Sequence, residues 1–193
     1  MVATVFPLYL SKFKHYYIVN GRVNMNFGEH TATHQQASHD CTAEIGGGGE
    51  IRYSYEYTSD GDYRIKSAAA LITRSNLDEG SSVTESSRIY ANKLNHRNEH
   101  FSTGMILSSK FGGNGGDAAN VFPQSQIVYD SAYKTYEDRI YNCILKSDDT
   151  SKAILRWEFS YRDAIDTRPH HVYYTVTFQG NSKCRSTSMT FDN

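Results

Sequence analysis

Three polar residues in the second half of the chain carry groups that could hydrolyse a phosphate ester. His100 has an imidazole, which can take a proton from water near neutral pH. Asn120 and Glu137 have oxygen atoms of the type that binds Mg²⁺. Hydrolysis needs both a base and a cation, so a cation site without a base would bind its ligand and leave it uncut.

A second group of side chains that could bind a metal lies nearer the N-terminus, at His30, His34 and His39, followed by Asp40 and Cys41. His30 and His34 are four residues apart, which would put two imidazoles on one face of a helix. The segment has no HExxH pattern and its composition is typical of a loop. We therefore expect surface histidines here and no metal.

A helix and several strands would have to hold the hydrolytic groups in place. Apolar residues recur at helical spacing over residues 125–146, which predicts the principal helix. Alternation of apolar and polar residues predicts strands over 51–57, 153–161 and 172–178. The Asp60-Gly61 turn predicts a hairpin. Together these patterns predict an α+β fold, with a mixed, mainly antiparallel sheet and one principal helix.

The first quarter of the chain is predicted to be a separate element. Residues 1–45 are expected to form an N-terminal arm with a hairpin at Asn20-Gly21. Four consecutive glycines at 46–49 predict a flexible hinge between this arm and a domain over 50–193. The arm residues expected to make contacts are Tyr9, Tyr16 and Tyr17.

The cysteines and the N-terminal residues bear on where the protein is found. Cys41, Cys143 and Cys184 are odd in number, so at least one thiol stays free or pairs between chains, and Cys41 or Cys184 is expected to bridge two chains. The N-terminus lacks the basic start of a secretory signal, and no apolar run approaches the length of a membrane span. We expect an intracellular protein, soluble or in intracellular particles, with no membrane partner.

The segment from residue 102 to 137 resembles the core of the DNA/RNA non-specific endonuclease family. These are metal-dependent nucleases with a strand-strand-helix motif, in which D-x-G-H-L-I-A-x-x-F-G-G precedes N-x-x-P-Q. The residues that match in order and spacing are Gly104, Phe111, Gly112, Gly113, Asn120, Pro123, Gln124, Tyr133 and Glu137. Glycine pairs and prolines fix turns, so the resemblance implies a nuclease-like strand-strand-helix core.

Three positions depart from the functional pattern of that family. Ser102 stands where the family has Asp, and Met105 stands where it has the general-base His. Neither side chain can take a proton from water. Tyr129, eight residues before Glu137, stands where the resemblance places the metal-binding Asn, and a neutral phenol is a poor magnesium ligand. The resemblance thus implies a site that has lost its catalytic residues.

Charge and composition weigh against nucleic acid and towards protein contacts. The 193 residues have a formal net charge of −1, so the chain lacks the overall positive field of most nucleic-acid binders. Basic residues that could still form a local groove around the motif are Arg88, Lys93, Arg97 and Lys110. Tyrosine is enriched at 15 residues, which suits either a contact surface or tyrosine-rich strands.

These observations lead to one main hypothesis and two alternatives. The main one is a non-enzymatic structural protein without a cofactor that assembles with itself, by exchange of its arm, into a matrix such as a viral occlusion body. The first alternative is a metal-dependent non-specific endonuclease of DNA or RNA, a toxin-type effector, which would use magnesium with His100, Asn120 and Glu137. The second is a pseudo-nuclease that binds nucleic acid or an inhibitor, for which steep salt dependence would be the signature.

Overall fold

The computed structural model describes residues 16–19, 22–25, 39–95, 100–180 and 184–193, with side chains from residue 39 onward. The chain divides into two compact units, Met1–Gln35 and Gln36–Asn193. In the first unit, β1 (Tyr16–Val19) and β2 (Arg22–Met25) pair antiparallel, which confirms the predicted hairpin. Tyr9, His30 and His34 lie outside the described residues, and the arm contacts of Tyr16 and Tyr17 stay predictions.

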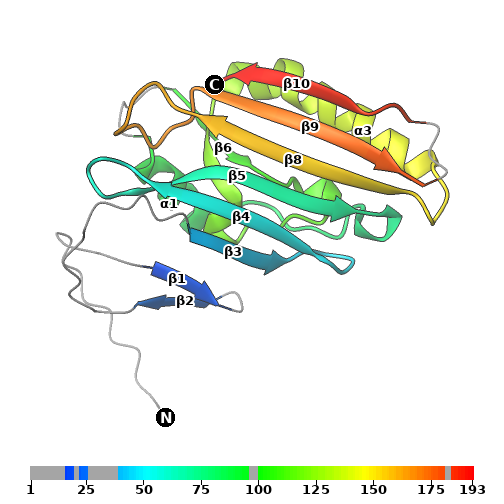
Figure 1. Ribbon diagram of the computed structural model, residues 1–193, viewed down its shortest axis with the longest axis horizontal. Coiled ribbons are helices and arrows are strands. Elements are labelled where there is room, and N and C mark those ends of the chain that lie inside the picture. Colours follow the sequence, from blue (N-terminus) through cyan, green and yellow to red (C-terminus); the bar gives the residue numbers. More distant parts are fainter. Residues whose placement is uncertain (1–15, 20–21, 26–38, 96–99, 181–183) are drawn as a thin grey trace, which may run out of the picture. The chain divides into compact units, whose positions relative to one another are not determined.

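The second unit is built on a six-stranded antiparallel sheet with the order β10-β9-β8-β5-β4-β3 (Figure 1). Its strands are β3 (His39–Glu44), β4 (Glu50–Tyr57), β5 (Tyr63–Ile72), β8 (Lys152–Ser160), β9 (His171–Gln179) and β10 (Thr187–Asp192). β3 falls inside the segment expected to be an arm, yet it pairs with β4 along its whole length. The α+β fold with a mainly antiparallel sheet is confirmed.

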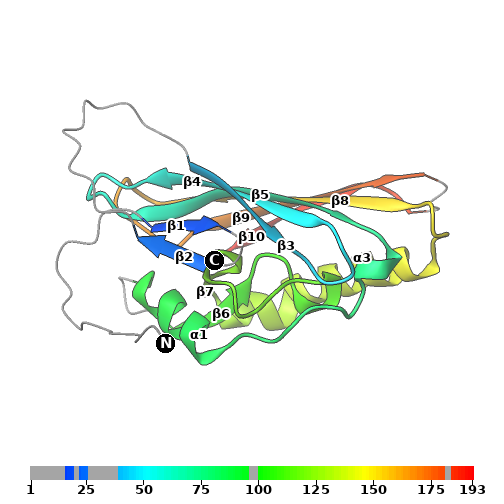
Figure 2. The ribbon, with the colours of Figure 1, turned by 90° about the horizontal axis from the view of Figure 1, so that it is seen from below.

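One face of the sheet is packed and the other faces solvent. Along β8, Leu155 and Trp157 are fully buried, whereas Arg156 and Glu158 are exposed on the opposite face. Figure 2 shows α1, α3 and the β6–β7 hairpin on the packed side. Such alternation is typical of an antiparallel sheet with one solvated face.

Helices and short strands form the layer over the packed face. They are η1 (Arg74–Asn76), α1 (Glu85–Lys93), β6 (Ser102–Met105), η2 (Ser109–Phe111), η3 (Ala118–Asn120), β7 (Val121–Gln124), α2 (Gln126–Val128), the π-helical turn η4 (Tyr129–Tyr133) and α3 (Lys134–Lys146). The predicted helix over 125–146 is therefore present as one continuous run, with a π turn inside it. Turns of this kind are frequent at functional sites.

Four of the fifteen tyrosines are buried in the core: Tyr53, Tyr133, Tyr136 and Tyr174. The Trp157 ring packs on Tyr174 at 4.7 Å between ring centroids, and its indole nitrogen donates a hydrogen bond of 3.1 Å to the Tyr133 hydroxyl. Both tyrosines are almost completely buried. Aromatic rings provide large buried areas, so this cluster anchors the helical run to the sheet.

The four glycines form a fixed turn, and the expected hinge is wrong. Gly47, Gly48 and Gly49 all have positive φ, and they connect β3 directly to β4. The buried Asn76 amide donates hydrogen bonds to the carbonyl oxygens of Gly46 and Gly48, at 2.9 and 2.6 Å. The glycines are needed for left-handed backbone, and a distant side chain holds that backbone in place.

Replacing Asn76 with alanine is expected to destabilise the second unit by about 1–3 kcal/mol. The change removes two hydrogen bonds that the buried Asn76 side chain donates to carbonyl groups of the turn. Urea unfolding of the two proteins measures the difference in free energy. The matched control is Ser75→Ala, which removes an exposed hydroxyl that bonds to Gly47 of the same turn. Equal losses in both variants would show that the Asn76 contacts do not matter.

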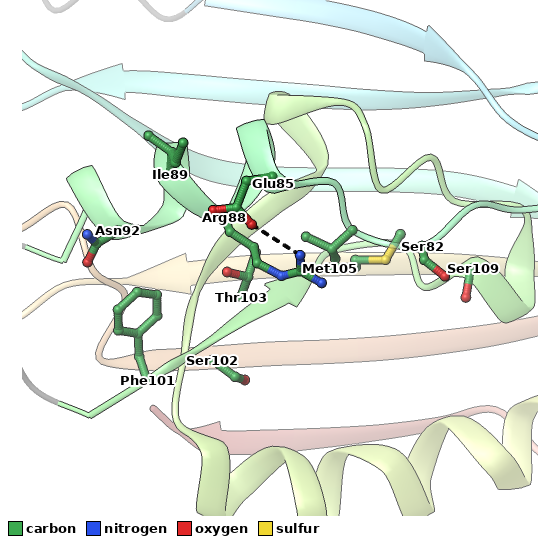
Figure 3. Close-up of a pocket in the computed structure, with 11 residues that line it drawn as sticks. Ser82, Glu85, Arg88, Ile89, Asn92, Phe101, Ser102, Thr103, Met105 and Ser109 are labelled. Atoms are coloured by element: carbon green, nitrogen blue, oxygen red, sulfur yellow. Dashed lines mark hydrogen bonds and ion pairs between the residues drawn. The ribbon is translucent and has the colours of Figure 1, made fainter.

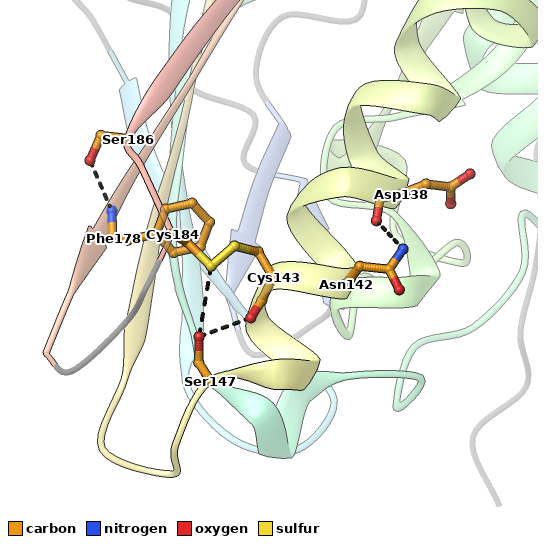
Figure 4. The surroundings of a disulfide bond; sticks show 7 residues. All are labelled: Asp138, Asn142, Cys143, Ser147, Phe178, Cys184 and Ser186. Carbon is orange, nitrogen blue, oxygen red and sulfur yellow. Dashed lines mark hydrogen bonds between the residues drawn. A yellow bond between two sulfur atoms is a disulfide. The ribbon is translucent and has the colours of Figure 1, made fainter.

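A disulfide joins α3 to the segment that precedes β10. Cys143 and Cys184 are bonded within one chain, with 6.0 Å between their Cα atoms (Figure 4). The expected role of Cys184 in bridging two chains is therefore wrong, because its sulfur is already used. Cys41 is a free, half-buried thiol, and burial raises its pKa to about 11, so it stays protonated at neutral pH. Its bridging role stays a prediction.

No helix within the described residues is long and apolar enough to cross a membrane.

Candidate functional site

β6, β7 and the helical run form a strand-strand-helix motif. β6 pairs antiparallel with β7, so Gly104 lies opposite Phe122 and Met105 lies opposite Val121. The chain then enters α2, η4 and α3, which carry Tyr129 and Glu137. The motif residues that the sequence singled out for structure are all buried: Gly104, Phe111, Gly112, Gly113, Pro123 and Gln124.

The loop between β6 and β7 needs its two glycines. Gly112 has a φ of +87°, in the left-handed region that favours glycine. A Cβ on Gly113 would lie 1.8 Å from the Leu107 carbonyl oxygen, so a larger residue does not fit. Backbone shape therefore explains both positions.

Asn120 is a structural cross-link of the same loop. Its side-chain oxygen accepts a hydrogen bond of 2.8 Å from the Leu107 amide, and its nitrogen donates to the carbonyl oxygens of Leu107 and Asn114, at 2.9 and 3.2 Å. The residue is only 1% exposed. This geometry gives Asn120 a structural role in place of the expected role in binding a cation, because its amide group is engaged in the loop.

Glu137 is the buried carboxyl group of the motif. The residue is 3% exposed, and its Oε1 atom has no hydrogen-bond partner among the described residues. Burial raises its pKa to about 8, and this outweighs the lowering by the Ser108 hydroxyl and the Lys110 ammonium group. The Ser108 hydroxyl lies near this carboxyl group but does not reach hydrogen-bond geometry. Glu137 is therefore mostly protonated at neutral pH.

The pKa of Glu137 makes the stability of the fold depend on pH. A raised pKa means that the folded chain binds the proton more tightly than the unfolded chain, whose value is 4.5. The stabilising contribution of the protonated form is fully present below 4.5 and is lost as pH rises through about 8. Between these two pH values the natural chain is expected to lose roughly 3 to 5 kcal/mol of its free energy of unfolding. The Glu137→Gln variant, whose side chain stays neutral, is expected not to show this loss.

Urea unfolding of both proteins at several pH values checks this expectation. Glu158→Gln is the matched control, because Glu158 is exposed on the outer face of the sheet. If the Glu137→Gln variant keeps the pH dependence of the natural chain, the raised pKa of Glu137 is not its cause.

Tyr129 lies in the π turn, close enough to Glu137 for the Glu137 charge to affect the pKa of its phenol. It is 36% exposed, and burial first and the Glu137 charge second raise the pKa of its phenol, while Lys110 lowers it. The phenol is therefore neutral at physiological pH. Lys110 also forms an ion pair with Asp138 on α3, so the Lys110 charge is already balanced.

Met105 lines a cavity of about 700 Å³ between α1 and β6 (Figure 3). Phe101, Ser102 and Ser109 line the same cavity. On α1, Arg88 forms an exposed ion pair of 3.4 Å with Glu85 at its wall. From the sequence alone, Arg88 is only a basic residue near the motif. Its place at the cavity could not be predicted, because the helix that carries it is short and mostly polar.

The remaining predicted residues do not come together as a metal site. His100 is exposed just before β6, and His39 bonds to the Tyr57 hydroxyl at 3.1 Å at the end of the sheet. Within the described part of the chain, no group of three or more His, Cys, Asp or Glu side chains could hold a metal ion. Among the predicted basic residues, Arg97 lies outside the described residues and Lys93 is exposed.

Comparisons with known proteins point to nucleases. A family model described as DNA/RNA non-specific endonuclease matches residues 47–180. A curated relative from Dickeya dadantii (strain 3937), a probable deoxyribonuclease RhsA, is 33% identical over 116 residues, which cover 60% of this chain and 8% of the relative. The expectation of a structural protein that assembles into a viral occlusion body is therefore wrong, because both similarities are to nucleases.

Proposed function

We propose that this chain, which belongs to the DNA/RNA non-specific endonuclease family, binds nucleic acid through its strand-strand-helix motif and cleaves it only slowly. The observation that carries the proposal is the position of Met105 at the end of β6, facing a cavity within an intact motif. We assign Met105 to the place of the general base. A thioether cannot take a proton from water, so the base-catalysed part of the rate is lost.

The family is typically magnesium dependent, and the residues present here do not fit such an ion. A magnesium site needs several oxygen ligands. The Asn120 amide is engaged in the loop, and Tyr129 offers only a neutral phenol. Two buried side-chain oxygens of the two strands and the helical run have no hydrogen-bond partner among the described residues: Oε1 of Gln124, in an amide group packed against Gly104, and Oε1 of Glu137, on a carboxyl group that is mostly protonated at neutral pH. We therefore derive no reaction step through a metal.

Two cations near the motif support binding of a phosphate backbone. Arg88 borders the cavity beside Met105, and Lys110 lies close to Tyr129 and Glu137. Each has a partially exposed acidic partner, and ion pairs of this kind contribute little stability. A phosphate group can therefore replace the carboxylates at small cost. With two such contacts, the logarithm of affinity should fall with the logarithm of salt concentration at a slope of about −2.

A second candidate function is hydrolysis with another base. It is favoured by the relative that is a probable deoxyribonuclease. His100 is the candidate base, because it is exposed and lies five residues before Met105 in the sequence. Glu137 would then be the acidic group of the site.

One experiment separates the two candidates. The purified chain is titrated with a labelled oligonucleotide at increasing salt, and the same preparation is incubated with supercoiled plasmid and Mg²⁺. Salt-sensitive binding with very slow nicking supports the proposal. Rapid nicking that disappears in His100→Ala establishes the second candidate instead. Absence of both binding and nicking at low salt would overturn both.

A further inference from the structure

β10 is an edge strand that has little support along its length. Among the described strands its one partner is β9, and its residues from Thr187 to Thr190 are exposed. The next residue, Phe191, is 3% exposed and packs against the rings of Tyr133 and Tyr136, with centroids 4.8 and 5.8 Å away. We call residues 184–193 the strap. Along its length the strap is held by its pairing with β9 and by contacts of Ser186 and Asp192 with that strand, and its two ends carry its anchors to the helical run.

One end of the strap is fixed by Asn193. The side-chain nitrogen of Asn193 donates hydrogen bonds of 2.9 Å to the carbonyl oxygens of Pro123 and Pro169, and its side-chain oxygen accepts one of 2.7 Å from the Ser125 amide. Its own backbone amide donates to the His170 carbonyl oxygen at 2.7 Å. The Asn193 amide group therefore ties the β7–α2 junction to the sheet.

Ser125 is the position at which this tie reaches the candidate site. It immediately precedes α2, where the helical run with Tyr129 and Glu137 begins. Backbone amides at the start of a helix have no partner within the helix and need one from elsewhere. Asn193 supplies that partner for Ser125, so the strap helps to set where the helical run starts.

The other end of the strap is fixed by the disulfide. Cys184 is bonded to Cys143, near the C-terminal end of α3, across 41 residues of sequence (Figure 4). The Ser147 hydroxyl donates to the Cys143 carbonyl oxygen at 2.8 Å and lies 3.9 Å from the Cys184 sulfur. The strap is thus anchored at both ends of the same helical run. Both cysteines are partly exposed, which leaves the bond open to attack by an external thiolate.

We propose that the strap is a redox-controlled tether of the nuclease motif. A dithiol reductant breaks the Cys143–Cys184 bond through a mixed disulfide. Two electrons and two protons pass to the two cysteine thiols, and the reductant is oxidised to its own disulfide. The released strap gains conformational freedom, since the bond had closed a long loop. Phe191, Asn193 and the pairing with β9 then hold β10 without the covalent anchor, and the Ser125 amide loses its partner more often.

Hydrogen exchange tests the tether without reference to nucleic acid. We expect amides of β10 and of Ser125 to exchange about tenfold faster, or more, after treatment with dithiothreitol. The variant Cys143→Ser/Cys184→Ser should show this fast exchange already and should not respond to the reductant. Cys41→Ser, which changes the free thiol, should keep the full response. Equal exchange in the oxidised and reduced natural chain would overturn the proposal, even if the serine variants fail to fold.

A variant at Asn193 tests whether the effect travels along the strap. In Asn193→Ala, Ser125 should exchange quickly in the oxidised chain, and reduction should change its exchange little further. A full reductive response at Ser125 in this variant would show that the disulfide acts by another route.

The consequence for the candidate site rests on the proposed function. We expect the reduced chain to bind the labelled oligonucleotide several-fold more weakly than the oxidised chain, because Tyr129 and Glu137 lie on the helical run that begins at the loosened β7–α2 junction. A change in exchange without oligonucleotide binding in either state upholds the tether and removes the proposed function. Equal binding with unchanged exchange removes the tether and leaves the proposed function standing.

Discussion

The double variant Met105→His/Tyr129→Asn is expected to cleave plasmid DNA about 10²–10⁴ times faster than the natural chain in the presence of Mg²⁺. A histidine at 105 provides a group that can take a proton from water, and an asparagine at 129 provides an amide oxygen for a cation. Met105 is only partly buried and lines a cavity, so an imidazole can be placed there without overpacking the core. Tyr129 is partly exposed in the π turn, so its ring can be removed at small cost.

The rate of conversion of supercoiled to nicked plasmid measures this gain. Each single variant should gain far less than the double variant, because hydrolysis needs the base and the cation together. Met105→Leu/Tyr129→Phe is the matched control, since it changes the same positions without adding a base or a ligand. If the double variant is folded, binds oligonucleotide and cleaves no faster than this control, then our assignment of positions 105 and 129 is wrong.

Replacing Asn120 with alanine is expected to destabilise the second unit by about 3–5 kcal/mol. The change removes three hydrogen bonds and leaves both polar groups of Leu107, which is fully buried, without these partners. Each buried polar group that loses its partner costs roughly 1–3 kcal/mol. Urea unfolding measures the loss.

The control for this variant is Asn142→Ala. Asn142 is exposed on α3 and its amide makes one bond to the Asp138 carbonyl oxygen, so the loss there should stay below about 0.5 kcal/mol. A stable Asn120→Ala variant with altered Mg²⁺ binding would return Asn120 to the role of a cation ligand. The two results are distinguishable in one preparation.

Local patterns predicted the elements of the fold well where each pattern decided the structure by itself. The Asp60-Gly61 turn joins β4 to β5 as expected, with Gly61 at a φ of +83°. The helical spacing over 125–146 found the helical run, but the π turn at Tyr129 leaves the apolar spacing almost unchanged and could not be predicted from it.

Predictions failed where a partner distant in sequence decides the structure. A run of glycines is compatible with a hinge and with a tight turn, and Asn76, roughly 30 residues away, selects the turn. Likewise, Cys143 and Cys184 are 41 residues apart on different elements, so spacing gave no indication that they pair. The role of Asn120 depends on its contacts with Leu107, which residue type alone does not reveal.

The tie between Ser125 and Asn193 also sets an order of events during synthesis. The two residues are 68 positions apart, and the ribosome adds roughly 5–20 residues per second, so Asn193 follows Ser125 by roughly 3 to 14 s. During that interval the nascent chain already contains β6, β7 and the helical run, but the last anchor of the motif has not been made. The nuclease motif therefore matures after translation of its own residues is over, when β10 docks.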